Sequence, residues 1–323
     1  LTFKEDPSVG LFREYLRLRT VHPEPDYDAA LRFLDRIAEE LELPITKIEV
    51  CPGRVVSIMT WEGTKPTLKS VLLNSHTDVV PVFQEHWKYD AFSAFKDAEG
   101  NIYARGSQDM KCVTIQYIQA VRRLKAEGWK PMRTVHLMFV PDEEVGGHKG
   151  METFVKHPGF QKLNIGFALD EGLANPGEAF TVFYGERNPW WITVHCPGSP
   201  GHGSRFVENT AAEKLDFEKQ IKQWCKEAGD DITYEFAQKH MNQNITSTDE
   251  KDPWWSAFSD ACKAIKCCLN LNFAIGFSPM NRTPILLHDH NEYLNEHVFL
   301  KGITVYERLI PALAGVSAFP DEA

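Results

Sequence analysis

A histidine and an aspartate follow an apolar run in the first third of the chain. The segment VLLNSHTDVVP (71–81) carries His76 and, two residues later, Asp78. A carboxylate at this spacing suits a metal-binding imidazole, because an acid next to the ring fixes its tautomer and raises its basicity. A solvated loop histidine beside a capping aspartate explains the pair equally well when it is taken alone.

Acidic side chains follow two further apolar runs. Asp142, Glu143 and Glu144 stand together before two glycines, and Asp170 and Glu171 stand together before a third glycine. Carboxylates this close repel one another unless a cation lies among them. A solvated acidic turn at the start of a helix is the alternative interpretation of the first group.

Two more segments complete the set of candidate ligands. Asp109 directly precedes a predicted helix, where an N-cap worth about 1 kcal/mol is the simpler interpretation. The apolar run before LLHDHNE (286–292) ends in two histidines and two acids. Together the five segments offer a mixed nitrogen and oxygen ligand set that suits Zn²⁺, and the surplus of acids suits a pair of ions. Two metal ions that share a carboxylate can polarise a carbonyl group and activate water for amide hydrolysis.

Hydrophobic periodicity indicates an α/β fold that would bring these segments together. Strands alternate with helices, so we expect a sheet with helices on both sides and the polar clusters at its carboxyl edge, each at a strand end. Helical spacing of apolar residues predicts helices, and nearly continuous apolar runs predict buried strands. The predicted helices cover 28–42 and 109–125, and the predicted strands cover 55–60, 71–74, 134–140 and 165–169.

A second module is expected to begin near residue 188. Residues 190–196 alternate between apolar and polar, which predicts a strand of an antiparallel sheet with one wet face, and 232–236 repeat the pattern. Between them, the apolar stripe of 211–215 and that of 217–225 lie on opposite sides of one helix. A two-stranded sheet is only marginally stable by itself, so we expect this module to be incomplete.

Composition excludes several classes of protein. The 323 residues are 43% hydrophobic and carry a formal net charge of −10, which argues against binding to nucleic acids or anionic membranes. No run of 18 apolar residues could span a bilayer, and residues 1–10 have no apolar core typical of a signal peptide. The seven scattered cysteines, without a CxxC pair, favour reduced thiols and a cytoplasmic location.

The combined motifs resemble the di-zinc superfamily of aminoacylases, carboxypeptidases and succinyl-desuccinylases, and within it the aminoacylases. The resemblance covers nearly the whole chain. It implies a zinc-binding catalytic domain with a mixed central sheet flanked by helices (1–187 and 241–323) and a smaller α+β lid domain that dimerises, of which 188–240 would be an incomplete remnant. The motifs are SHTDVVPV (75–82), YARGSQDMK (103–111), FVPDEEVGGHKGME (139–152), FALDEG (167–172), PGHGSRF (200–206) and GFSPMNRTPILLHDHNE (276–292).

The resemblance also implies the ligands of two zinc ions per chain. His76 and Glu171 would hold one ion, Glu144 and His288 the other, and Asp109 would bridge them. The H-x-x-N-E pattern of the family selects the first histidine of His288-Asp-His as the ligand.

Three further residues receive catalytic roles from the same resemblance. Glu143 would be the general base that takes a proton from the bridging water and passes it to the leaving amine. Asp78 would orient His76. His202, in Pro-Gly-His-Gly-Ser, would reach the active site of the partner subunit and stabilise the developing oxyanion, although an ordinary loop histidine is the alternative.

The implied reaction is hydrolysis of N-acyl-L-amino acids, for example N-acetyl-methionine, to a carboxylate and a free amino acid by a hydroxide that bridges two zinc ions. A dipeptidase or carboxypeptidase of the same superfamily is the nearest alternative. No nucleic acid or membrane partner is expected.

The chain departs from the family in two places. Relatives carry most of the lid between the positions of Leu215 and Asp216, and a strand and turn with a substrate-contacting Arg between those of Leu269 and Phe273. Both stretches are absent here. The five implied ligands and the implied general base are present. Much of the surface through which relatives dimerise, and of the segments that contact their substrate, is missing. A zinc-binding but inactive chain, for which the family homodimer is doubtful, is therefore the second hypothesis.

Overall fold

The chain forms two compact units. A computed structural model describes residues 5–184, 190–195, 223, 225–227, 233–239, 248–264, 269–271 and 276–322. The larger unit combines Leu1–Gly185 with Ile245–Ala323, and the smaller unit is Glu186–Asn244. Among the described residues, no helix has both the length and the apolar content that a membrane crossing requires.

A mixed five-stranded sheet forms the centre of the larger unit, as the sequence predicts. Its antiparallel half joins the first, second and sixth strands, whereas the third and seventh run parallel to the sixth. The carboxyl ends of these three parallel strands therefore reach the same edge of the sheet. In spatial order the strands are β1 (Ile45–Cys51), β2 (Arg54–Trp61), β6 (Val135–Val140), β3 (Ser70–His76) and β7 (Ile165–Leu169).

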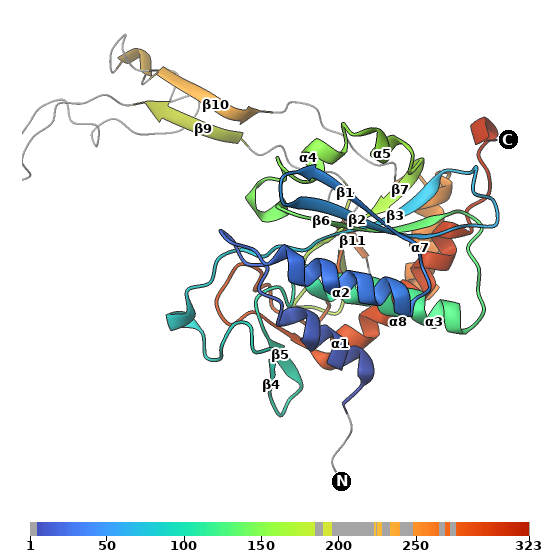
Figure 1. The fold of residues 1–323 in the computed structure, drawn as a ribbon, viewed down its shortest axis with the longest axis horizontal. Coiled ribbons are helices and arrows are strands. Elements are labelled where there is room, and N and C mark those ends of the chain that lie inside the picture. The colour runs from blue at the N-terminus through green and yellow to red at the C-terminus, as the bar shows by residue number, and fades with distance from the viewer. Residues whose placement is uncertain are drawn as a thin grey trace, which may run out of the picture. The chain divides into compact units, whose positions relative to one another are not determined.

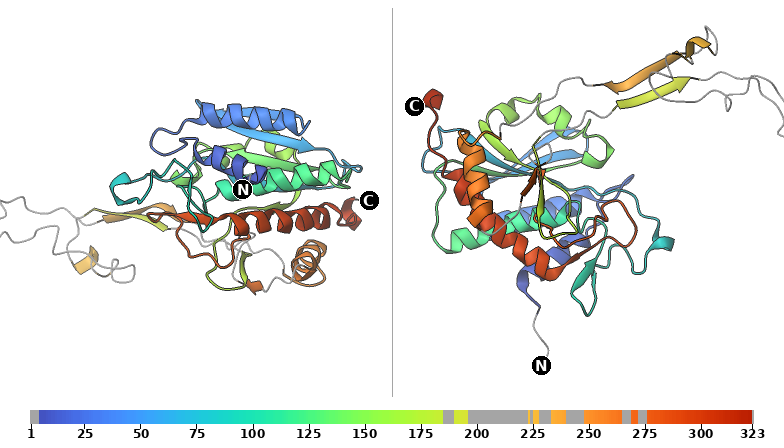
Figure 2. Two further views of the ribbon diagram at one scale, coloured as in Figure 1. Left: turned by 90° about the horizontal axis from the view of Figure 1, so that it is seen from below. Right: turned by 180° about the vertical axis from the view of Figure 1, so that it is seen from behind.

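Helices cover both faces of this sheet (Figure 1). Every residue of β3 and β6 is buried, and alternate side chains enter different clusters. Val71 and Leu73 pack with the large helices, whereas Leu72 packs with the short helices on the other face. The large helices are α1 (Pro7–Leu16), α2 (Tyr27–Glu40), α3 (Lys111–Ala126) and α8 (Glu296–Ala314), and the short ones are α4 (Met151–Phe154) and α5 (Pro158–Gln161). Figure 2 shows α8 running alongside α3.

The other described elements of the larger unit are small sheets, one further helix and 3-10 helices. One small sheet has the order β13 (Tyr293–Asn295), β5 (Asn101–Tyr103), β4 (Phe95–Lys96). Another has the order β11 (Leu269–Leu271), β8 (Phe180–Phe183), β12 (Gly276–Phe277). Helix α7 (Pro253–Ala264) and the 3-10 helices at Gln84–His86, Glu143–Val145 and Pro320–Glu322 complete the described elements of this unit.

In the smaller unit, β9 (Trp190–His195) and β10 (Thr233–Lys239) pair as an antiparallel ladder. The two alternating patterns predicted both strands. The stripe change predicted between 211 and 225 lies almost entirely outside the described residues.

The interpretation of Asp109 as the N-cap of α3 is wrong. The helix begins at Lys111 with Met110 as its N-cap residue, and no side chain caps it. Asp109 therefore does not act as the cap, and its carboxylate is available for other contacts.

A buried ion pair fastens the end of the chain to the sheet. Arg133, just before β6, is fully buried and donates through both terminal nitrogens to Glu322, at 2.7 Å each. The same guanidinium donates to the main-chain oxygens of Lys69, Val316 and Ser317. These bonds to Arg133 lower the pKa of Glu322 to about 2.

We predict that Glu322→Gln reduces the free energy of unfolding at pH 7 by about 2 kcal/mol, because a buried guanidinium loses its charged partner. The native pKa of Glu322 is below its unfolded value of 4.5. The stabilisation is therefore complete above pH 4.5 and is lost as the pH falls toward 2. Urea unfolding of both proteins at several pH values measures this difference. A difference that does not shrink in acid would contradict the prediction.

Candidate metal centre

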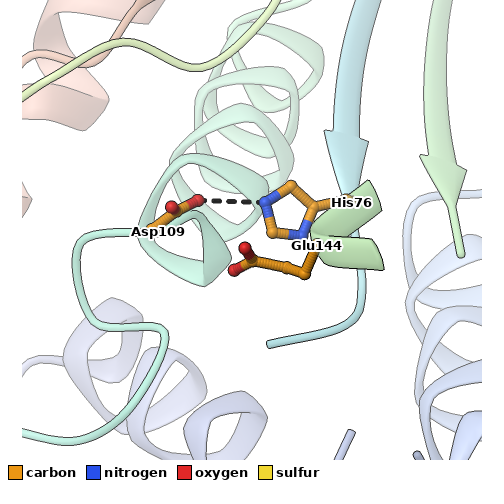
Figure 3. A group of neighbouring side chains, drawn as sticks. All are labelled: His76, Asp109 and Glu144. Carbon is orange, nitrogen blue, oxygen red and sulfur yellow. Dashed lines mark hydrogen bonds and ion pairs between the residues drawn. The ribbon is translucent and has the colours of Figure 1, made fainter. Parts of the chain in front are cut away.

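Five predicted ligands converge at the carboxyl edge of the central sheet. His76 is the last residue of β3, Glu144 lies in the 3-10 helix after β6, and Glu171 follows β7 by two residues. Asp109 comes from the loop between β5 and α3, and His288 from a turn before β13. Figure 3 shows Asp109 facing His76, with the carboxylate of Glu144 beside them.

The two oxygens of Asp109 face two different histidine and glutamate pairs. Oδ1 of Asp109 lies 3.0 Å from Nε2 of His76, which is 3.1 Å from Oε2 of Glu171. Oδ2 of Asp109 lies 3.2 Å from Nε2 of His288, which is 2.9 Å from Oε2 of Glu144. One carboxylate is thus shared between two similar groups of donors.

These donors fit a metal-binding centre. Ligand atoms of His76, Asp109 and Glu144 lie within 4.8 Å of one another, as do those of His76, Glu143 and Glu171. Oε1 of Glu144 is buried and has no hydrogen-bond partner among the described residues. Four carboxylates outnumber the two imidazoles among the described residues, so protons or cations must balance the charge of the cluster.

The carboxylates strongly favour the charged imidazoles. Hydrogen bonds to Asp109 and Glu144 raise the pKa of His288 to about 10. Burial disfavours the charged form of His76, but Glu171 and Asp109 outweigh it and raise its pKa. Without metal, protons therefore occupy the ring nitrogens that face the cluster.

Glu143 has the acidity of a general base or acid that works near neutral pH. Desolvation of its carboxyl group, opposed by His76 and assisted by Glu144 and Asp109, raises the pKa of Glu143 to about 7. Proton transfer is most efficient when the pKa of the catalytic group is close to the working pH.

Asp78 contacts several residues of the centre, but its carboxylate is not hydrogen-bonded to His76. Nδ1 of His76 donates to the main-chain oxygen of Asp78 at 2.9 Å, whereas the nearest carboxylate oxygen is 3.7 Å away. The carboxylate instead accepts from the main-chain N–H groups of Glu143 and Glu144, both at 3.1 Å. It also bonds Nε2 of His22 at 2.8 Å. Asp78 therefore contacts His76 through its backbone and the acidic loop through its side chain.

Two contacts explain why Asp142, the first of the three consecutive acids, does not face the cluster. Asp142 has a left-handed backbone (φ 62°) and is buried. Its carboxylate accepts from the hydroxyl of Tyr27 and from Nε of Arg54, both at 2.6 Å. Asp142 is an anchor of the loop, and only the next two acids face the cluster. No local pattern in the sequence points to His22, Tyr27 or Arg54, because each lies far along the chain from the acid that it contacts.

The prediction that every cluster follows a strand end is wrong for His288. This residue lies in a turn with a left-handed backbone (φ 63°), and β13 begins only five residues later. The apolar residues before it form a surface loop, in which Ile285 is 48% exposed. A left-handed conformation costs a residue other than glycine on the order of 1 kcal/mol, so surrounding contacts must hold this turn. His202 lies outside the described residues, and its role stays a prediction.

We predict that Zn²⁺ binding at pH 7 releases protons. The neutral imidazole is the ligand, whereas the raised pKa values keep His76 and His288 protonated in the metal-free protein. Affinity should therefore increase as the pH rises toward 10. Calorimetric titration in buffers with different ionisation enthalpies measures the release. A binding enthalpy that does not depend on the buffer would contradict the prediction.

Relatives of this chain are similar over almost its whole length. Aminoacylase-1 of Sus scrofa is 50% identical over 399 residues, which cover 99% of this chain and 98% of that protein. Aminoacylase-1 of Dictyostelium discoideum is 39% identical over 408 residues, which cover 98% and 99%. An alignment of 399 positions exceeds the 323 residues of this chain, so at least 76 internal positions of the Sus scrofa protein have no counterpart here.

Solved structures share the fold. The M20 family metallo-carboxypeptidase Sso-CP2 of Sulfolobus solfataricus superposes with a TM-score of 0.71 at 14% identity, over 96% of this chain and 100% of the other. Human carnosine dipeptidase 1 gives 0.68 at 13% identity, over 96% and 97%. Residues 72–312 also match the sequence family described as peptidase family M20/M25/M40. These findings confirm the resemblance of the motifs, and the chain belongs to peptidase family M20/M25/M40.

Proposed function

We propose that this protein hydrolyses N-acyl-L-amino acids, such as N-acetyl-methionine, to a carboxylate and a free L-amino acid. The observation that carries the proposal is the shared position of Asp109, whose two oxygens face two histidine and glutamate pairs. Identity of 50% to an aminoacylase over nearly the whole chain supports the substrate class.

The proposed cofactor is a pair of Zn²⁺ ions. His76 and Glu171 would hold one, Glu144 and His288 the other, and Asp109 would bind both. Mixed imidazole and carboxylate ligands suit Zn²⁺. When bound, the ions supply Lewis acidity, which polarises the amide carbonyl and makes a water molecule more acidic.

Glu143 performs the proton transfers in this mechanism. Its carboxylate takes a proton from the attacking water, whose oxygen adds to the carbonyl carbon. The same carboxyl group then gives the proton to the amide nitrogen as the carbon–nitrogen bond breaks. A pKa of about 7 suits both steps. Asp78 keeps the loop of Glu143 and Glu144 in place through their main-chain N–H groups.

The smaller unit, in this proposal, is what remains of a lid domain. His202, from the same region, would reach the active site of a partner subunit and stabilise the oxyanion of the tetrahedral intermediate there. The unpaired thiols of Cys51, Cys112 and Cys225 support a cytoplasmic location.

We predict that Glu143→Gln abolishes hydrolysis of N-acetyl-methionine while the zinc content stays unchanged. Gln keeps the shape of the side chain but accepts no proton, and general-base catalysis typically contributes about 10²–10⁴-fold to the rate. Elemental analysis and the hydrolysis assay on the same sample measure both properties. Glu152→Gln is the control, because that exposed residue pairs with His148 and Lys156 instead of the cluster. Normal turnover by Glu143→Gln would refute the assigned base.

A catalytically inactive, metal-binding chain is the second candidate, and the 76 or more missing positions favour it. The unmodified protein distinguishes the two candidates. Two zinc ions per chain with turnover support the aminoacylase, whereas two zinc ions without turnover of acetyl-methionine or simple dipeptides support the inactive form. Cleavage of dipeptides alone would move the activity to the peptidases of the family.

A further inference from the structure

Glu292 is a fully buried carboxylate that has no part in the proposed reaction. The loop before α3 surrounds it with donors. The main-chain N–H groups of Gln108 and Gly106 lie 2.6 and 3.2 Å from its oxygens, and the hydroxyl of Ser107 and the N–H of Asp109 lie 3.4 Å away. The backbone that ends in the shared ligand Asp109 is thus wrapped around one carboxylate.

Arg105 connects this carboxylate to the opposite ligand loop. Its Nη1 donates to Glu292 at 2.8 Å, and its Nη2 donates to the main-chain oxygen of His288 at 3.3 Å. Arg105 is 2% exposed, and its guanidinium lies over the ring of Trp87. One planar group therefore holds both the carboxylate behind Asp109 and the left-handed turn of His288.

The small sheet brings the two loops to the same place. β5 and β13 are antiparallel with Tyr103 opposite Tyr293, so the loop after β5 and the loop before β13 leave the same end of the ladder. The N–H of Ala104 extends the pairing by donating to the main-chain oxygen of Glu292 at 3.1 Å. Arg105 and Glu292 are the charged pair at this end.

We propose that Arg105 and Glu292 are positioning residues for the metal centre, Glu292 through Asp109 and Arg105 through His288. This inference rests on the two-metal site of the proposed function. Groups that orient metal ligands without touching the metal typically change metal affinity about 10–100-fold when they are replaced. Because the two residues act on different ligands, their replacement has different consequences for the two ions.

The first test is Co²⁺ binding to the metal-free Arg105→Lys protein. Lysine keeps a positive charge beside Glu292 but cannot bond the carboxylate and the oxygen of His288 through one planar group. One Co²⁺ ion should bind as in the wild type, and the other, at Glu144 and His288, at least about ten-fold more weakly. The visible spectrum of bound Co²⁺, which reports ligand geometry, should change.

Glu292→Gln is a second, independent test, in which a different change in the two Co²⁺ affinities is expected. This variant keeps the size of the side chain and removes the charge that holds the loop of Asp109. Since Asp109 serves both ions, both affinities should fall. If circular dichroism shows that Arg105→Lys is unfolded, this variant carries the test.

Arg133→Lys is the matched control. Arg133 is also a buried guanidinium that bonds a carboxylate and main-chain oxygens, but its partners are Lys69 and residues near the end of the chain, and none of them is a proposed metal ligand. This variant should melt at a lower temperature and bind both Co²⁺ ions as the wild type does.

Three outcomes would overturn the proposal. Wild-type affinities and spectra in the folded variants at 105 and 292 would show that the pair is only structural. Equal loss of Co²⁺ affinity in Arg133→Lys would show that general destabilisation is the cause. A wild-type protein that binds no Co²⁺ would instead refute the two-metal site, and the proposed function with it.

Discussion

Repulsion between carboxylates at one edge of the sheet is the constraint on which the centre depends. In the described part of the chain, Asp109, Glu143, Glu144 and Glu171 share this edge with two imidazoles, those of His76 and His288. Protons or cations must balance the remaining negative charge. The anchors behind the cluster hold the backbone against this repulsion: Asp78 bonds two N–H groups of the acidic loop, and Tyr27 and Arg54 fix Asp142. The negative potential that a metal ion needs is thus built into the fold.

The central sheet and half of the centre could be predicted from the sequence. Apolar runs such as Val71–Asn74 lie in strands that are buried on both faces, so their pattern depends on burial alone. Parallel strands then require His76, Glu144 and Glu171 to meet at one edge. In this half, local pattern and tertiary structure carry the same information.

The other half could not be derived from periodicity. Asp109 and His288 lie in loops whose shape depends on contacts between residues more than 180 positions apart, such as Arg105 with Glu292. No local pattern encodes such a contact. An exposed apolar residue at Ile285 also resembled part of a strand, although it belongs to a surface loop. Residue types made the segment 286–292 a candidate, and the resemblance of whole motifs to a family selected His288 within it.

The separation of the two ligand loops along the chain also sets the order in which the centre can be completed during synthesis. All five strands of the central sheet end by residue 169, and His76, Asp109, Glu144 and Glu171 all lie before residue 172. His288, Glu292 and β13 lie more than 110 residues later. As the ribosome extends the chain, the residues that would hold one metal ion in the proposed centre are therefore all made before the set for the second ion is completed by His288.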